Sequence, residues 1–366
     1  MALRKKGHDI VSITLTRPGE PWYYKWLRRF YLWTQNKWFL AAVEAQWLKP
    51  ISKQLDNAVN SIGPEVVLVI HGDWLAYSTF QYPTCIIHDT TFASILDYYP
   101  SFTNLTTRSI AMGNEMYQRA LNRSDAAVFS ADWASQSAIL HYGSAKSKIF
   151  TIPFGANINP VPTATEVSEW VDVRSESQIC NLVFIGTQWE RKGGPEALRF
   201  VELLNRSGIA SVLTVIGCAP SIPPLMKDYV RQVGYLKKES DADKEMFHDI
   251  LRDAHALLLP SHAECFGCVY CEANAYALPA LGRETGGVSE IIKDGVNGLL
   301  LKPGEPIDTF AARWACIWTN RTAYRKMSHN AYTEFSRRLN YDVFADSLEQ
   351  VLVPIVMNRN KLSHVA

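Results

Sequence analysis

Short apolar segments that alternate with helix-length segments set the strongest limit on how this chain can fold. In the first half these apolar segments are residues 66–70, 84–87, 126–129 and 148–152. Between them, residues 114–122 and 133–142 have helical character. A strand joined through a helix to the next strand is typical of a parallel sheet with helices on both faces. We therefore expect a parallel α/β domain over residues 1–155.

A second series of the same kind follows a polar stretch that begins after Pro160 and Pro162. Its apolar segments are residues 182–185, 212–216, 256–259 and 298–301. The 366 residues of the chain exceed what one hydrophobic core usually holds. We expect a second doubly wound domain over residues 156–340, and an amphipathic helix at about residues 341–358 that completes the first domain.

Residues 257–290 read LLLPSHAECFGCVYCEANAYALPALGRETGGVSE, which predicts a strand, a polar loop and a helix. Glu264 comes just before this helix, and Glu272 lies inside it. Along a helix their separation is about 12 Å. The two carboxyl groups of a glycosidase lie only about 5 to 9.5 Å apart. A longer separation suits two groups that bind hydroxyls at opposite ends of an extended ligand.

The start of the same helix offers amides that face an anion between the two glutamates. These amides belong to Gly267, Cys268 and Val269. Hydroxyls, then a diphosphate, then hydroxyls again is the layout of a sugar nucleotide. The spacing fits equally well if Glu264 interacts with the helix dipole and Glu272 is a solvated helix residue. Both interpretations stay open at this level.

Two adjacent cations, Arg191 and Lys192, follow the predicted strand 182–185. The glycines at 193 and 194 let the chain turn tightly into a helix that begins near Pro195. Cations at such a turn suit a diphosphate whose negative charge grows as it leaves. A solvated basic turn is the alternative. Because the carboxyl ends of parallel strands meet at one sheet edge, we expect both cations near Glu264.

Composition narrows the classes of protein and ligand. Lys plus Arg is 37 and Asp plus Glu is 36, so a globally basic nucleic-acid binder is not indicated. Three of the seven cysteines, at 265, 268 and 271, are spaced for a metal site or for one buried helix face. No fourth ligand follows with zinc spacing, so we expect neither metal nor other cofactor. No signal peptide or long apolar run is present, which predicts cytoplasmic residence.

Aromatic and basic residues crowd together in residues 22–47. Trp22, Trp26, Phe30 and Trp33 share one face if this segment is helical. Such a face suits peripheral contact with an anionic membrane surface. The alternative, which we favour, is that these rings pack on the domain core or line an acceptor cleft, because both kinds of amphipathic helix give the same pattern.

Two histidines, His71 and His88, follow predicted strands of the first domain. Ligands of doubly wound sheets bind beyond the carboxyl ends of the strands, where both would lie. A histidine that is merely hydrogen-bonded at a strand end gives the same pattern. We favour this simpler interpretation for His71.

Four segments of the second half carry a resemblance in order and spacing. They are residues 186–193 (GTQWERKG), 260–272 (PSHAECFGCVYCE), 285–290 (TGGVSE) and 294–299 (DGVNGL). Together they resemble the donor-binding half of retaining glycosyltransferases of family 4, which have the GT-B fold. The first half is similar more weakly, through residues 6–8 (KGH), 88–89 (HD) and 152–155 (IPFG). The resemblance implies two doubly wound domains that face a cleft.

The resemblance also implies roles for single residues. Glu264 would contact sugar hydroxyls, Glu272 the ribose, and Lys192 with Arg191 the leaving diphosphate. His88 matches the family histidine near the anomeric carbon. His262 would line the donor site, and the base would lie near Tyr235. Gly186 and Phe266 complete the expected donor site, with the amides of residues 267–269.

Two departures from the family pattern concern the cations and the beginning of the chain. Thr187 stands where the family usually has an arginine, so Arg191 is expected to replace it. Family members normally begin with a strand and a glycine-rich turn, whereas this sequence begins within the helix that follows. Residues 2–6 are expected to end that helix and residues 9–15 to form a strand, so the first domain would lack its first strand.

The expected activity is transfer of a sugar, with retention of configuration, from a UDP or GDP sugar to an acceptor hydroxyl. The acceptor would be a saccharide or a lipid-linked sugar, in glycan, polysaccharide or glycolipid synthesis. Two alternatives stay open. One is an N-terminally truncated protein that binds sugar nucleotides with impaired catalysis, and the other is a sugar-nucleotide epimerase.

Overall fold

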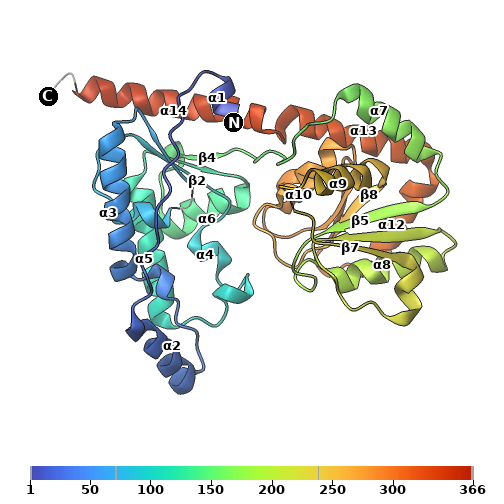
Figure 1. Cartoon of the computed structure of the whole chain (residues 1–366), viewed down its shortest axis with the longest axis horizontal. Coiled ribbons are helices and arrows are strands. Elements are labelled where there is room, and N and C mark those ends of the chain that lie inside the picture. The colour runs from blue at the N-terminus through green and yellow to red at the C-terminus, as the bar shows by residue number, and fades with distance from the viewer. Residues whose placement is uncertain (1, 71, 238, 364–366) are drawn as a thin grey trace. The chain divides into compact units, whose positions relative to one another are not determined.

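The computed structural model describes residues 2–70, 72–237 and 239–363. These form two compact α/β units (Figure 1). The first comprises Met1–Ile152 together with Ala345–Ala366, and the second comprises Pro153–Phe344. Each is built on one sheet whose paired strands all run parallel. The predicted class, two parallel-sheet α/β domains, is confirmed.

The sheet of the first unit has four strands in the order β1-β2-β3-β4. They are β1 (Val67–Ile70), β2 (Thr84–His88), β3 (Ala126–Phe129) and β4 (Ile149–Thr151). Every residue of β3 is buried, as expected of a central strand covered on both faces. The core is closed by side chains of α3 (Ala45–Ile62), α5 (Thr107–Arg123) and α6 (Asp132–Tyr142).

Residues 9–15 do not form the strand that the sequence predicted. They have no regular secondary structure and lie outside both sheets. Ile13 and Leu15 pack against the first core. Just beyond them, the backbone of Thr16 exchanges two hydrogen bonds with the side chain of Gln54 on α3. A helix side chain therefore takes the place of a neighbouring strand as hydrogen-bond partner.

Helix α14 (Tyr341–Ser363) begins in the second unit and continues in the first from Ala345 onward. Its acidic side chains hold the segment after α1 (Ala2–Lys5). Lys6 Nζ lies 2.6 Å from Asp346 Oδ1 and 2.8 Å from Glu349 Oε2. His8 Nε2 lies 2.6 Å from Glu349 Oε1. These ion pairs join the two sequence ends of the first unit.

The aromatic segment begins with α2 (Trp22–Gln35), at the end of the first unit opposite α14 in Figure 1. The favoured expectation, that its rings pack on the domain core, is wrong for one face of the helix. Tyr24 is buried in a small cluster with Phe39 and Ala41. The side chains of Trp22, Trp26, Phe30 and Trp33 are exposed. The inner face of the helix packs in this cluster, together with Tyr23, Leu27 and Tyr31, and the four exposed residues are not part of it.

The sheet of the second unit has six strands in the order β10-β9-β8-β5-β6-β7. They are β5 (Cys180–Ile185), β6 (Ser211–Ile216), β7 (Val230–Gly234), β8 (Ala256–Leu259), β9 (Ala280–Arg283) and β10 (Gly298–Leu301). The sequence did not predict β7 or β9. β7 is a half-exposed edge strand, and β9 reads ALGR, without a β-branched residue.

Helices lie on both sides of this sheet in Figure 1, with α8 (Gly194–Arg206) on one side and α9 (Asp241–Asp253) and α10 (Cys268–Ala275) on the other. α8 packs on α12 (Ile307–Thr319) through the rings of Phe200 and Phe310, whose centroids are 5.6 Å apart. The remaining helices of this unit include α7 (Ala164–Ser175) and α13 (Arg321–Arg338). The arrangement is doubly wound, as expected.

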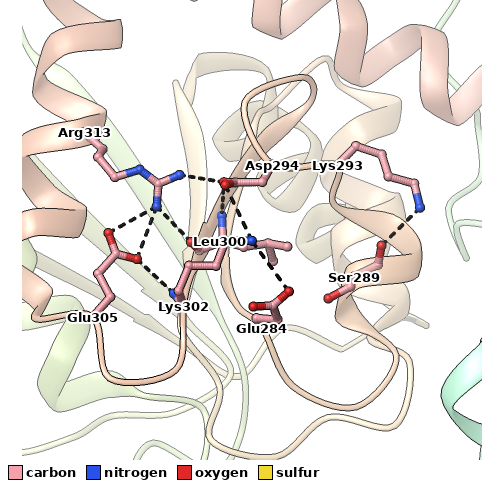
Figure 2. A network of polar contacts seen from close by, with 8 residues as sticks. All are labelled: Glu284, Ser289, Lys293, Asp294, Leu300, Lys302, Glu305 and Arg313. Carbon is pink, nitrogen blue, oxygen red and sulfur yellow. Dashed lines mark hydrogen bonds and ion pairs between the residues drawn. The ribbon is translucent and has the colours of Figure 1, made fainter.

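The motif at residues 294–299 closes the turn before β10, and a polar network holds it there (Figure 2). Asp294 Oδ1 accepts hydrogen bonds from the backbone of Leu300 at 2.8 Å and from Arg313 on α12 at 2.7 Å. Arg313 also donates to the carbonyl of Leu300 at 3.0 Å and contacts Glu305 at 3.2 Å. The aspartate of this motif therefore fastens β10 to α12.

A buried polar cluster joins three elements of the second unit around His255. The backbone N–H of Asn181 donates to His255 Nδ1 at 2.9 Å, and His255 Nε2 lies 3.1 Å from the carbonyl of Arg174. The guanidinium of Arg174 donates to the carbonyls of Ala254 and Tyr276, each at 3.0 Å. Burial, reinforced by the charge of Arg174, lowers the pKa of His255 to about 4. The imidazole is therefore neutral in the folded protein at neutral pH.

This cluster predicts that the protein loses stability in mild acid. Below about pH 6.5 His255 is protonated in the unfolded chain, whereas in the folded chain it stays neutral down to about pH 4. The free energy of unfolding should fall by about 2 kcal/mol between about pH 7 and pH 5. Urea unfolding at the two pH values measures this loss. His255→Gln should reduce the loss, and the same change at the exposed His329 should leave it unaltered.

Candidate functional site

The loops after β5 and β8 define the candidate site. These strands are neighbours, and the chain order of the sheet changes direction between them: β6 and β7 continue on one side, β9 and β10 on the other. Ligands of open α/β sheets bind beyond the carboxyl ends of strands at such a switch point. The loop after β5 carries residues 186–193, and the loop after β8 carries residues 260–267. Both resemblance motifs therefore meet at one place.

The two loops touch through their backbones. Gly193 has φ of +78°, and a Cβ atom there would lie 2.3 Å from the carbonyl oxygen of Pro260. The backbone N–H of His262 donates to the carbonyl of Arg191 at 2.8 Å. A side chain at position 193 would push the loops apart. Glycine is therefore required for both the turn and the close approach.

The site contains a mostly buried cluster of two cations and a carboxylate. Lys192 Nζ forms an ion pair with Glu264 Oε2, and Arg191 lies 3.7 Å from the same oxygen. Arg191 also donates to the carbonyl of Ala263 at 2.6 Å and to the side chain of Gln188. The exposed fractions of the side chains are 13% for Lys192, 11% for Glu264 and 19% for Arg191.

Such burial contradicts the solvated basic turn that the sequence left open. Charges removed from water are costly unless they have close, well-oriented partners. Here the partners are supplied by two loops that are 72 positions apart in the chain. The expected neighbourhood of Arg191, Lys192 and Glu264 is therefore real. Gly186 belongs to it too, because a Cβ atom there would lie 3.0 Å from Lys192 Cγ.

Helix α10 begins directly after the second loop. Its N-cap is Gly267, with φ of +94°, where a Cβ atom would lie 2.7 Å from the ring of Tyr270 and 3.0 Å from Glu264 Cγ. The hydroxyl of Tyr270 donates to the carbonyl of Leu259 at 2.6 Å and so fixes the helix to the end of β8. The first amides of a helix have no acceptor within it. The first residues of α10 are Cys268 and Val269, and they follow Gly267, which lies beside the Glu264 side chain.

The other predicted residues of this loop and helix have different environments. Phe266 is buried against Phe154, with ring centroids 5.5 Å apart. Glu272 is half-buried on α10. Tyr235 is exposed and follows β7, three strands from β8 in the sheet order. The structure brings together the residues around positions 186–193 and 264–269, and leaves Tyr235 apart from them.

The sequence suggested that the three clustered cysteines share one buried helix face, and this is wrong. Cys265 precedes α10, so that only Cys268 and Cys271 lie on the helix. All three are thiols that form no disulfide, and burial raises the pKa of Cys271 well above its ordinary value. Within residues 2–70, 72–237 and 239–363, no three metal-binding side chains gather in a way that suits a metal ion.

Two residues behind the second loop were missed by the sequence analysis. Glu196 is in the first turn of α8, and its Oε1 lies 2.7 Å from His262 Nε2 and 3.1 Å from Arg283 Nη2. Arg283, the last residue of β9, also donates to the carbonyl of Pro260 at 3.3 Å. These contacts connect the second loop to α8 and β9. An acidic residue in a first helical turn is common, so nothing in the sequence distinguishes this role.

His88 ends β2 in the first unit, as predicted. Its Nδ1 lies 3.2 Å from the hydroxyl of Tyr117, which donates to the carbonyl of Thr90 at 2.7 Å. Its Nε2 lies 3.8 Å from Asp89. The ring is thus hydrogen-bonded at a strand end. His71 falls outside the residues that the structure describes.

Comparison with known proteins shows what the second unit is similar to. Residues 182–334 match the family model of Glycosyl transferases group 1. The match covers the part of the second unit that contains both loops. A curated relative, the D-inositol 3-phosphate glycosyltransferase of Nocardiopsis dassonvillei, is 26% identical over 216 residues, which are 55% of this chain and 50% of that protein. The chain spans about half the length of the curated relatives that it matches first.

Solved structures extend the similarity to both units. A sucrose-phosphate synthase from Thermosynechococcus elongatus has a TM-score of 0.63 at 15% identity, covering 88% of this chain and 79% of that one. The Anabaena protein HepE in complex with UDP-glucose has a TM-score of 0.60 at 15% identity, covering 83% and 82%. At such identities the likeness shows the fold, which is that of GT-B glycosyltransferases.

Proposed function

We propose that this protein is a retaining glycosyltransferase of family 4, which transfers a sugar from a UDP or GDP sugar to an acceptor hydroxyl. The observation that carries the proposal is the Arg191–Lys192–Glu264 cluster at the switch point of a parallel sheet, beside the start of α10. The family match over residues 182–334 supports it, as does a structural neighbour solved with UDP-glucose. The acceptor in this proposal is a saccharide or a lipid-linked sugar, and the site of action is the cytoplasm.

Charge explains what the cluster would do. As the bond between the anomeric carbon and the phosphate oxygen breaks, negative charge grows on the departing nucleoside diphosphate. In this proposal Lys192 and Arg191 stabilise that charge, together with the first amides of α10. Their pairing with Glu264 keeps both cations oriented before the donor arrives. Fixed cations of this kind supply the electrostatic stabilisation without a metal ion.

The remaining residues are assigned to the successive parts of the donor: sugar, ribose and base. Glu264 would accept hydrogen bonds from sugar hydroxyls, Glu272 would bind the ribose, and the base would lie toward Tyr235. Gly186 and Phe266 would border the donor, and His88 is a candidate for contact with the sugar. For retention, the new bond forms on the face from which the diphosphate leaves. The acceptor proton then passes to an oxygen of the leaving phosphate.

A turnover assay tests the proposal. The purified chain is incubated with UDP, GDP and ADP sugars, with and without simple glycoside acceptors, while release of nucleoside diphosphate is followed. We expect release with one donor, and proton NMR should show a product with the donor's anomeric configuration. An inverted product would contradict retention. Binding without release would identify a noncatalytic sugar-nucleotide-binding protein, and conversion of the donor sugar without acceptor would identify an epimerase.

A further inference from the structure

Helix α2 has two aromatic faces, and only one of them has a partner. On the inner face, the ring of Phe39 packs against Tyr24 and Tyr31, each with centroids 5.7 Å apart. On the outer face, the exposed fractions are 79% for Trp22, 58% for Trp26, 39% for Phe30 and 85% for Trp33. The fold has already filled the cluster beneath α2, so the outer rings contribute nothing to it.

The outer residues form one continuous row. Successive members are four, four and three positions apart, which places them on the same side of a helix. Trp26 and Phe30 stack with ring centroids 5.3 Å apart. Isolated exposed apolar residues are normal on protein surfaces, but a contiguous patch of this kind marks an interaction site. We call Trp22, Trp26, Phe30 and Trp33 the aromatic row.

The charged residues within α2 are all basic. Residues 21–43 contain Lys25, Arg28, Arg29 and Lys37 and no acidic residue. Arg28 pairs with Glu20 outside the helix, whereas the side chains of Lys25 and Arg29 are exposed beside the row. Aromatic rings flanked by cations match the interface of an anionic lipid bilayer, where the rings can enter the apolar region and the cations can contact the negative headgroups.

The helix is held firmly by the rest of the first unit. At its carboxyl end, Asn36 adopts a left-handed conformation, and its carbonyl accepts a hydrogen bond from the side chain of Asn104 at 2.6 Å. The backbone N–H of Trp38 donates to the carbonyl of Asn104, and the carbonyl of Trp38 accepts from the N–H of Thr106, each at 2.9 Å. Near its beginning, the hydroxyl of Tyr23 donates to Gln46 at 2.6 Å. The aromatic row is thus presented on a braced helix.

We propose that α2 is a membrane-docking helix, which lies in the plane of an anionic bilayer with the aromatic row at headgroup depth and Lys25 and Arg29 against lipid phosphates. Among the residues that the structure describes, no helix has the length and apolar character needed to cross a membrane. Docking parallel to the surface is the geometry that such a helix allows. The inference rests on α2 alone and is independent of sugar transfer.

Vesicle co-sedimentation of the whole purified chain tests the docking. We expect binding to phosphatidylcholine vesicles with about 30 mol % phosphatidylglycerol, weakened by salt, and little binding to pure phosphatidylcholine. The double variant Trp26→Ser, Trp33→Ser should lower the partition coefficient at least about tenfold. Lys25→Gln with Arg29→Gln should lower it by about 25-fold on the anionic vesicles, roughly fivefold for each cation.

A matched control uses exposed apolar residues away from α2. Leu140 and Leu225, which are 74% and 90% exposed, are replaced by serine, and binding should remain that of the wild type. Unchanged thermal unfolding shows that each variant is folded, as expected for exposed sites. The proposal is overturned if the wild type binds no vesicles or if the α2 variants bind as it does. It is also overturned if the wild type is a dimer that the tryptophan variant dissociates, because the row would then contact a second copy.

Discussion

Replacing Lys192 with alanine is expected to lower the turnover rate for sugar transfer by about 10²–10³-fold, the usual effect of removing one preorganised group that stabilises developing charge. The lysine is mostly buried, paired with Glu264 and anchored in a loop at the switch point of the sheet. Its charge is therefore fixed in place before the diphosphate leaves. Arg191 would keep part of the stabilisation, since it lies only 3.7 Å from the same carboxylate oxygen.

The comparison variant is Lys244→Ala. Lys244 is a half-exposed lysine of the same unit whose partner is the exposed Asp241 at 2.8 Å. Exposed pairs of this kind contribute little to stability, and the residue lies on α9 rather than in either loop. Its rate should equal that of the wild type. If Lys192→Ala transferred sugar at a rate within a few fold of the Lys244→Ala rate, the assignment of Lys192 to the leaving group would be wrong.

Gly193→Ala should be among the most damaging single changes in the second unit. The residue has φ of +78°, a conformation that costs an L-residue about 1–2 kcal/mol. In addition, the new Cβ atom would lie 2.3 Å from the Pro260 oxygen, so one loop must move. We expect the free energy of unfolding to fall by about 3 kcal/mol in total. Because Lys192 and Glu264 sit on the two loops, donor affinity should fall as well.

A second glycine separates the two causes. Gly295 has φ of +77°, almost the same φ as Gly193, but nothing lies within 4 Å of a Cβ atom placed there. Gly295→Ala should therefore cost only about 1–2 kcal/mol and leave donor binding unchanged. Urea unfolding and donor titration of both variants provide the measurement. Equal losses of stability for the two changes would show that the loop contact contributes nothing.

The buried parallel strands were the most predictable part of the fold. Residues 126–129 and 256–259 are strands with the expected bounds, because continuous apolar runs are typical of central parallel strands. β7 and β9 were not predicted because neither is a continuous apolar run. Their pairing depends on neighbours far away in sequence. The segment 9–15 has strand-like composition, but the structure leaves it outside both sheets.

At the candidate site, the sequence indicated which residues meet but not how they are held. The proximity of Lys192 to Glu264 followed from strand order and from the family resemblance. The support from Glu196 and Arg283 did not, because it depends on where α8 and β9 lie in space. The burial of individual aromatic residues could not be predicted either, because the sequence does not distinguish the packed face of α2 from its exposed aromatic row.

The central claim is that the loops after β5 and β8 bind a nucleoside diphosphate through Lys192. Calorimetric titration of the wild type, Lys192→Ala and Lys244→Ala with UDP, GDP and ADP tests it most directly. The account predicts that one of the three binds the wild type and Lys244→Ala alike. Its affinity for Lys192→Ala should be at least about tenfold weaker, from the loss of a charge-assisted hydrogen bond. Failure of all three to bind, or equal affinity in all three proteins, would contradict it.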